Sequence, residues 1–401
     1  MKFEADIDGI RYSLNTDEQE AMVVRSTDKE YTGEVVIPAS FFYQGIVYRI
    51  TRIEMWAFRD CTSLTAINIP EGVTSIGWGA FEDCSSLIAI NIPEGVTSIG
   101  ERAFAGCSSL TAITLPESVT NIEESAFESC SSLITIVVAE ENKAYDSRGG
   151  CNAIIETNTN TLIQGCSVTI IPESVTSIGE RAFSDCTSLT AITIPEGVTS
   201  IGNWAFSNCS SLIAITIPEG VTSIGDYAFK GCSSLTSITI PEGVTNIEES
   251  AFESCSSLTA INIPEGVTSI GWRAFAGCTS LTAITIPEGV TSIEWRAFAG
   301  STSLTGILIP KSVAVIEYSV FDGSGITYLT ILGKPTIDEK AFDRCEKLTD
   351  IYCYSEEVPP AENAFSGLDL SRITLHVLEN VIEVYKNTEP WSRFGTIEAI
   401  K

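Results

Sequence analysis

Cysteine is the residue whose type and spacing most suggest chemistry in this 401-residue chain, which has thirteen. Zinc sites need closely spaced ligands, and the chain has no C-x-x-C pair and no histidine near these cysteines. Neighbouring in-register side chains also keep their Cβ atoms about 4.8 Å apart, against about 3.8 Å in a disulfide. We therefore expect buried thiols that act as small apolar side chains. Nine share one position of a 23-residue spacing, Cys345 fits it and Ser301 takes it once: Cys61, Cys84, Cys107, Cys130, Cys186, Cys209, Cys232, Cys255 and Cys278.

Two other cysteines, Cys151 and Cys166, flank a segment that resembles a β-hairpin turning at Thr157–Asn160. If the turn is symmetrical, pairing outward from it places Cys151 opposite Cys166. Cross-strand pairs without hydrogen bonds come close enough for a disulfide. The pattern therefore allows a disulfide, and two free thiols are the alternative.

The single histidine, His376, lies in the strand-like segment ITLHV. A general base needs an orienting partner and a nucleophile within reach, and the spacing of the sequence supplies neither. The chain also lacks a P-loop, a G-x-G-x-x-G fingerprint and a G-x-S-x-G elbow. We expect an ordinary cap histidine, no cofactor, no metal and no enzymatic activity.

The charge of the chain limits its partners. Its formal net charge is −29, which argues against nucleic acid because phosphate neutralisation needs clustered Lys and Arg. Docking on anionic lipid is disfavoured for the same reason. No apolar run approaches the roughly 18 residues of a membrane span.

Nine glutamates follow the prolines of the repeat and should form an exposed acidic stripe. Such a stripe could collect Ca²⁺ loosely, but the chain has no EF-hand loop and no repeated Asp-rich loop. We interpret it as a solvated stripe that favours solubility. Lys311 ends the series, whose members are Glu71, Glu94, Glu117, Glu173, Glu196, Glu219, Glu242, Glu265 and Glu288.

Trp272 and Trp295 occupy equivalent places 23 residues apart. On stacked repeats they should lie side by side. Paired exposed aromatic side chains bind sugar faces or another protein. Packing along the ridge of the molecule is the alternative.

All these residues recur within one repeat. Prolines are spaced by 23 residues from Pro70 to Pro310, except for one interval of 56. A period of 20–29 residues with L-x-x-I-x-I is typical of a leucine-rich-repeat solenoid. We expect each coil to contain a parallel strand ending at the proline, a second extended pass, and a single helical turn such as Gly77–Cys84.

The ends of an open solenoid must be capped, because they expose core and strand edges. Residues 1–50 should form a β-rich cap, with strands in GIRYSL, AMVVRS, GEVVIP and IVYRITRI. Residues 51–365 should form about fourteen coils, with the hairpin inserted within 139–171. Residues 366–401 should form a closing cap with a strand near Ile373–Val377, a helix around Val381–Lys386, and Trp391 and Phe394 as plugs.

The consensus IPEGVTSIGxxAFxxCxSLTxI resembles the BspA-type, or Treponema pallidum-type, leucine-rich repeat proteins over about residues 30–401. The insertion Tyr145–Cys166 and the closing segment Val381–Ile400 are similar to segments in surface proteins of gut Bacteroidales. The resemblance implies a curved, commonly exported solenoid with binding or adhesion roles, and no catalytic residues. Leu378-Glu379-Asn380 departs from the usual Pro-x-Gly before the closing helix, so that corner should differ.

A ligand site is predicted at the C-terminal end of the concave face. In L-x-x-I-x-I the third and fifth residues point outward. In the central coils these are small and uncharged, whereas aligning the last coils gives Tyr328/Thr330, Asp350/Tyr352 and Arg372/Thr374. Tyr and Arg are enriched at binding hot spots. Divergence of end coils that merely adjoin a cap is the alternative.

We therefore expect a non-catalytic binding or adhesion module whose solenoid contacts a protein or glycan ligand. A structural spacer without a ligand is the alternative. A cell-surface or secreted location is implied by the resemblance alone, because Met1–Gly9 is polar and acidic rather than signal-like. A cytoplasmic location is the alternative.

Overall fold

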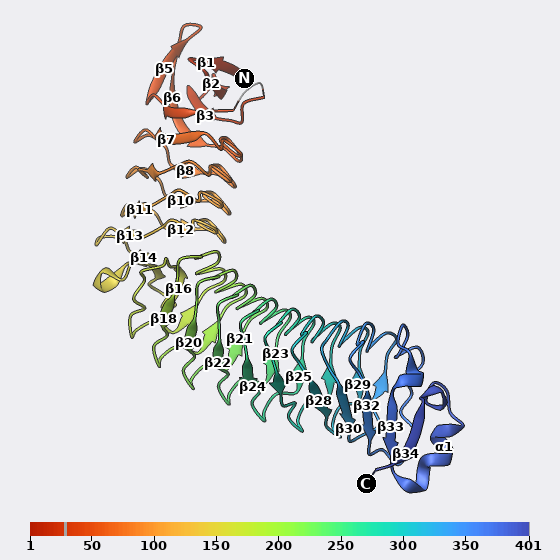
Figure 1. Ribbon diagram of the computed structural model, residues 1–401. Helices are drawn as coiled ribbons and strands as arrows, with labels where there is room; N and C mark the ends of the chain where they lie inside the picture. The colour runs from red at the N-terminus through yellow and green to blue at the C-terminus, as the bar shows by residue number, and fades with distance from the viewer. Residues whose placement is uncertain (28–29, 401) are drawn as a thin grey trace. The chain divides into compact units, whose positions relative to one another are not determined.

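The structure, a computed structural model, describes residues 1–27 and 30–400 (Figure 1). The chain divides into two compact units, Met1–Leu189 and Thr190–Lys401. In each unit the chain winds into coils that lie side by side as rungs (Figure 1). Each regular coil has three sides: a first strand, a second shorter strand and a run of turns. The predicted division at residues 50 and 365 stays a prediction.

The first side is a parallel sheet made by the L-x-x-I-x-I segments. Leu64, Ile67 and Ile69 point inward and are at most 5% exposed, while Asn68 points outward. The proline that follows cannot donate to the ladder, so the strand ends there. In unit 1 the strands are β4 (Gly33–Val36), β7 (Leu64–Asn68), β9 (Ala89–Ile90), β11 (Ala112–Leu115) and β13 (Thr135–Val138). In unit 2 they are β18 (Ala191–Thr193), β20 (Ala214–Thr216), β22 (Ser237–Thr239), β24 (Ala260–Asn262), β26 (Ala283–Ile284), β28 (Gly306–Ile309), β30 (Tyr328–Ile331), β32 (Asp350–Cys353), β33 (Thr374–Val377) and β34 (Thr396–Ala399).

The second side is the predicted second extended pass. It is short, and it pairs in parallel and in register, as Ser98 does with Ser75. In unit 1 it comprises β6 (Ile46–Ile53), β8 (Ser75–Ile76), β10 (Ser98–Ile99), β12 (Asn121–Ile122) and β17 (Ser177–Ile178). In unit 2 it comprises β19 (Ser200–Ile201), β21 (Ser223–Ile224), β23 (Asn246–Ile247), β25 (Ser269–Ile270), β27 (Ser292–Ile293), β29 (Val315–Ile316) and β31 (Thr336–Ile337).

The third side is a run of tight turns, so the predicted helical turn at Gly77–Cys84 is wrong. Gly79 and Asp83 have φ of 54° and 60°, and a residue in the left-handed region interrupts a right-handed helix. The same two positions have positive φ in thirteen coils of the described chain. Alternate amides donate to the next coil: the Phe81 N–H donates to the Ala103 carbonyl at 2.7 Å, whereas the Glu82 N–H donates to the Gly79 carbonyl of its own coil. Each run of turns therefore donates forward along the stack.

Phenylalanine rings from the turns stack into a ladder inside each unit. Neighbouring rings lie 5.1–5.4 Å apart from Phe58 to Phe127 and 5.3–5.6 Å apart from Phe206 to Phe365, with planes within 10°. Tyr31 covers the first ring at 4.8 Å. These rings are almost fully buried, so they close the core of each unit along its length.

The N-terminal residues form an antiparallel meander that joins the second side. Its strands are β1 (Lys2–Ile7), β2 (Ile10–Asn15) and β3 (Glu20–Val23), and β3 pairs with β6. The four predicted strand segments are confirmed, at β2, β3, β4 and β6. Another strand, β5 (Ser40–Tyr43), forms a hairpin with β6. Tyr12 and Tyr48 are buried in this region.

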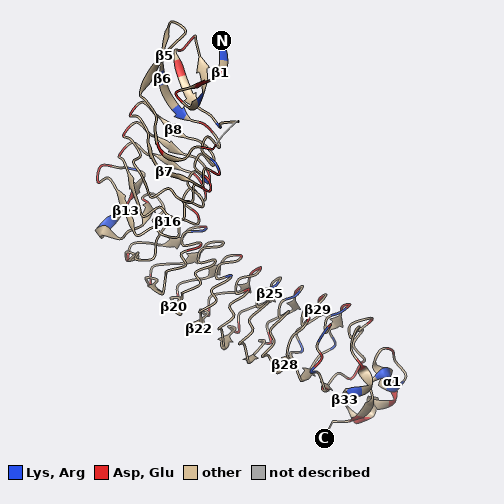
Figure 2. Ribbon diagram, turned by 45° about the horizontal axis from the view of Figure 1, so that its top comes forward, with Lys and Arg blue, Asp and Glu red and all other residues tan. Residues whose placement is uncertain are grey.

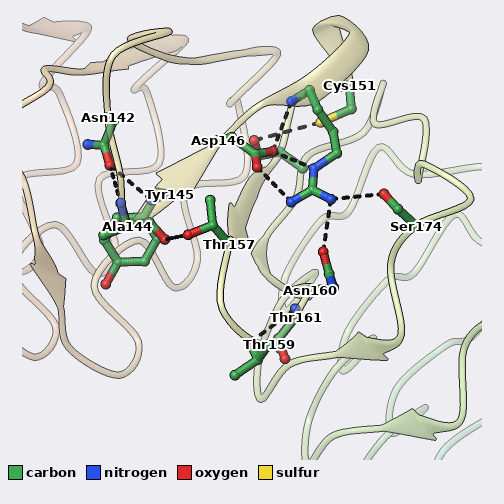
Figure 3. Close-up of polar contacts among 12 residues, drawn as sticks. Asn142, Ala144, Tyr145, Asp146, Cys151, Thr157, Thr159, Asn160, Thr161 and Ser174 are labelled. Carbon is green, nitrogen blue, oxygen red and sulfur yellow. Dashed lines mark hydrogen bonds and ion pairs between the residues drawn. The ribbon is translucent and has the colours of Figure 1, made fainter.

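The insertion is the predicted β-hairpin with one more strand in front. It comprises β14 (Tyr145–Asp146), a 3₁₀ turn η1 (Arg148–Gly150), β15 (Ile154–Glu156) and β16 (Thr161–Gln164). β16 pairs in parallel with β17 and so takes the place of a second-side strand. Arg148 holds the insertion: it binds Asp146 at 2.6 and 2.7 Å, Asn160 at 2.9 Å and Ser174 at 3.0 Å. Figure 3 shows this network beside the Asn142 and Thr157 hydrogen bonds.

The C-terminal segment closes the core of unit 2 as predicted. Trp391 and Phe394 pack edge-on against Phe365 at 5.4 and 5.3 Å, and both are buried. The predicted strand and helix are confirmed at β33 and α1 (Ile382–Lys386). The 3₁₀ turns are η2 (Leu370–Arg372), η3 (Glu379–Val381) and η4 (Trp391–Arg393). The last strand, β34, was not predicted, and it extends the first side beyond β33.

Candidate functional site

The repeated cysteines are buried free thiols. Seven of these thiols donate to a phenylalanine carbonyl of the preceding coil, as Cys84 does to Phe58 at 3.1 Å and Cys255 to Phe229 at 3.2 Å; the other five are Cys107, Cys130, Cys232, Cys278 and Cys345. Burial raises the pKa of the Cys130 and Cys232 thiols to about 12. A protonated, covered thiol is neither nucleophile nor metal ligand. The interpretation as packing residues is confirmed.

Cys151 and Cys166 are also free and buried. Near the turn the register is as predicted, with Glu156 opposite Thr161. A bulge between Ile154 and Ile155 then shifts the pairing by one residue. The Cys166 thiol consequently donates to the Asn152 carbonyl at 3.5 Å. The two thiols are unbonded in this structure, and the bulge removes the two cysteines from opposite positions.

The repeat glutamates are exposed along both units, as expected of a solvated stripe. Within residues 1–27 and 30–400, no three His, Cys, Asp or Glu side chains are grouped so that they could hold a metal ion. None of the helices described there is long and apolar enough to cross a membrane.

The outward residues of the last first-side strands form the main candidate site. Tyr328 lies opposite Asp350, and Thr330 opposite Tyr352, as the alignment predicts. The predicted place of Arg372 is wrong, because it lies in η2, outside the strand. From Asp350 to its partner Thr374 the chain takes 24 residues, two more than from Tyr328 to Asp350.

The residue that faces Tyr352 is His376, which the sequence analysis treated as an ordinary cap residue. Its ring stacks on that of Tyr352 at 4.3 Å. Its Nε2 lies 3.1 Å from Asp350 and its Nδ1 lies 3.2 Å from Glu398. A sequence signal for this placement existed: Leu375 and Val377 alternate in the same way as Ile351 and Cys353 of the previous coil. Aligning the two coils by these buried residues, instead of by a constant repeat length, places His376 opposite Tyr352.

These side chains lie in two adjacent rows on one face of the sheet, Tyr328 with Asp350 and Tyr352 with His376 and Glu398, and together they are called the aromatic row. A hydrogen bond from the Thr349 hydroxyl, followed by the contact with His376, lowers the pKa of Asp350. An imidazolium can donate to both flanking carboxylates at once. The aromatic row therefore presents the stacked rings of Tyr352 and His376 next to the carboxylates of Asp350 and Glu398.

Tyr328 begins this row on an open surface. It is 48% exposed. Its ring lies over Gly306, where even a Cβ would collide with it. Leu308 beside it is 45% exposed. The central coils instead show small outward residues, such as Ala214 and Thr216 on β20.

The predicted neighbourhood of Trp272 and Trp295 is confirmed. Their rings meet edge to face at 6.2 Å, and Trp272 is 49% exposed. The guanidinium of Arg296 lies 5.5 Å from the Trp295 ring. Burial, followed by the charge of Glu317, raises the pKa of Glu294 next to this pair. Aromatic and charged groups thus meet at the corner between the second side and the turns.

Ion pairs run along the turn side of unit 1. Arg102 lies between two carboxylates: its Nε is 2.7 Å from Glu82 and its Nη1 is 2.8 Å from Glu128. Glu82 also pairs with Arg59, and Glu128 with Arg181. Acidic and basic side chains therefore alternate from coil to coil.

Coils of parallel strands around a continuous hydrophobic ladder define a leucine-rich-repeat solenoid. The position-specific pattern defines it further. Residues 44–148, 159–282 and 268–388 match the family described as BspA type leucine rich repeat region. The chain belongs to this family.

Solved structures of bacterial proteins agree with this. A leucine-rich cell surface protein of Faecalibacterium prausnitzii is 29% identical, with a TM-score of 0.60 over 91% of this chain and 98% of that one. A leucine-rich repeat protein of Eubacterium ventriosum is 26% identical, with a TM-score of 0.63 over 82% and 96%. The pneumococcal antigen PcpA shares the fold at 15% identity and a TM-score of 0.53, over 100% and 98%. No curated protein matches significantly.

Proposed function

We propose that this chain is a non-catalytic binding module of the cell surface that contacts a protein or glycan ligand through its aromatic row. The observation that carries the proposal is the change from small residues on the central strands to Tyr328, Tyr352 and His376 on β30, β32 and β33. Aromatic side chains held in place by neighbours are typical of binding hot spots. The cell-surface location rests on the similarity to the Faecalibacterium cell surface protein.

The test is a binding screen of the purified chain against host glycoproteins, matrix proteins and glycans at physiological salt, since low salt exaggerates attraction to basic partners. We expect Tyr328→Ala/Tyr352→Ala to weaken binding about ten-fold or more. The matched control is Arg372→Ala, which removes an exposed side chain outside the row and should leave affinity unchanged.

The melting temperature decides whether a loss is local. It should change by no more than about 2 °C in the double variant, since Tyr328 is half exposed. Undiminished affinity in that variant would exclude the aromatic row. Failure to bind any member of the screen would favour a structural spacer.

A further inference from the structure

On the turn side of unit 2, two groups of ion pairs meet without an acidic residue between them. Lys230 and Arg273 share the carboxylate of Glu253. Arg296 and Arg344 share that of Asp322, at 3.0 and 2.5 Å. Figure 2 shows basic and acidic residues along this side of the coils, near β25 and β29. Four cations and two carboxylates leave a local excess of positive charge on a chain of net charge −29.

A cavity lies where the two groups meet. Arg273 and Arg296 occupy the same position of consecutive coils, and both line a groove of about 350 Å³. Glu253, Asp322 and Arg344 line it at the two ends, and small residues beside Arg273 and Arg296 leave space next to the guanidinium groups. These small residues are Ala276, Gly277, Ala299 and Gly300.

In unit 1, Arg102 shows the contacts that an arginine at this position makes when it has two carboxylate partners. Arg102 donates to two carboxylates of its own chain, Glu82 and Glu128. Arg273 and Arg296 each pair with only one, and the Nε of each is shielded from solvent without a hydrogen-bond partner. A shielded donor without a partner and two neighbouring like charges are both unfavourable. In the repeat, Ala276 and Ala299 stand at the position that Glu82 and Glu128 occupy.

We propose that this cavity binds the carboxylate of an acidic sugar between Arg273 and Arg296. Guanidinium groups recognise carboxylates through paired hydrogen bonds. A sugar is favoured over a peptide because Trp272 and Trp295 lie next to the two arginines in the chain, outside the cavity lining, with the Arg296 guanidinium 5.5 Å from the Trp295 ring, and indole faces pack against the C–H face of a sugar ring. The carboxylate of Glu317, from the next coil, accepts a hydrogen bond from the backbone N–H of Trp295 at 3.0 Å. The neutral part of the ligand therefore lies toward the indoles and its carboxylate toward the arginines.

The first experiment measures binding of an oligogalacturonate to the full chain by calorimetry. The methyl-esterified oligomer serves as the matched ligand, because it has the same sugar without the charge. We expect the acid to bind with an affinity that falls as salt rises, and the ester to bind at least ten-fold more weakly. Absence of binding, or equal binding of acid and ester, would overturn the proposal. Polyglutamate that binds as tightly as the oligogalacturonate would overturn the assignment to a sugar.

The second experiment changes the cavity itself. Arg273→Gln/Arg296→Gln should weaken oligogalacturonate binding ten-fold or more. Ala276→Glu should do the same while raising the melting temperature, because the chain then supplies its own carboxylate. Arg102→Gln, an arginine already held by two carboxylates, is the control and should leave binding unchanged. Full affinity in the double variant would refute the site. The aromatic row is a separate surface, so Tyr328→Ala/Tyr352→Ala should not affect this binding.

Discussion

Ser301 shows what the cysteine position requires of its residue. Its hydroxyl donates to the Phe275 carbonyl at 3.0 Å, where the Cys278 thiol donates to Phe252 at 3.2 Å. Both side chains are small, buried and able to donate once. The thiol therefore serves as a hydrogen-bond donor that also packs like an apolar group.

Alkaline pH should destabilise the chain through these thiols. Burial raises the pKa of Cys232 and Cys278 from 9.0 to about 12. Between these values the unfolded state releases protons that the folded state retains, so stability is intact below about pH 9 and falls up to about pH 12. We expect the free energy of unfolding, measured in urea, to decline over this range.

The control is Cys232→Ser/Cys278→Ser, which cannot ionise there. Its decline should be shallower than that of the original chain, with little change at pH 7. Equal slopes for the two proteins would show that the thiols do not drive the effect.

At the scale of elements, the sequence predicted the strands better than the turns. Alternating Leu and Ile in L-x-x-I-x-I fix which residues of β18 to β24 are buried, because a strand has a period of two. The run containing Ala and Phe has helix-like spacing, but left-handed residues at two positions make it a series of turns. Arg273 and Arg296 occupy one of these positions. Arginine is not a residue type that favours positive φ, so its presence does not predict such a turn.

Gly323 tests the backbone requirement of these turns. Its φ is 65°, and no atom lies within 4 Å of an added Cβ, so only conformation limits the residue. Asn208 occupies the same position with φ of 58°. We expect Gly323→Asn to cost less than about 1 kcal/mol and Gly323→Val about 1–2 kcal/mol, as measured by urea unfolding. Equal costs would mean that the positive φ is not needed.

The insertion depends on one side chain that sequence reasoning did not single out. Arg148 joins Asp146, Asn160 and Ser174. We expect Arg148→Ala to lower stability by about 1 kcal/mol, since the group is partly exposed, and to speed amide hydrogen exchange in β14. Arg148→Lys should have smaller effects on stability and on amide exchange than Arg148→Ala. Unchanged exchange would show that strand pairing alone orders the segment.

For the whole molecule, stability should be additive over neighbouring coils. Deleting 214–236 removes one repeat and joins Ile213 to Ser237, which starts the equivalent strand. The shortened chain should fold, with a calorimetric unfolding enthalpy lower by about 16 kcal/mol. Ligand binding by the aromatic row should be unchanged. A chain that fails to fold would contradict nearest-neighbour additivity.

The sequence predicted the repeat and the plugs Trp391 and Phe394, because each is a strong apolar signal. It placed Tyr328, Asp350 and Tyr352 together, because their coils are equally long. Arg372 was placed wrongly and His376 was missed, because the alignment kept a constant coil length although Leu375 and Val377 indicate a longer coil. The bulge between Ile154 and Ile155 was not predicted either, because a one-residue shift in strand pairing has no sequence motif of its own.

Because the turns donate backbone hydrogen bonds toward the following coil, the turn side of unit 2 has a net peptide dipole. The N–H groups of Phe229, Phe252 and Phe275 all point to the following coil, so their peptide dipoles add along the column as they do along a helix axis. The first-side strands do not add in this way, since parallel pairing sends bonds to both neighbours. The column therefore ends with partial positive charge at its last turn, around Phe365. The closing segment packs Trp391 and Phe394 against this positive end of the column, beside Phe365.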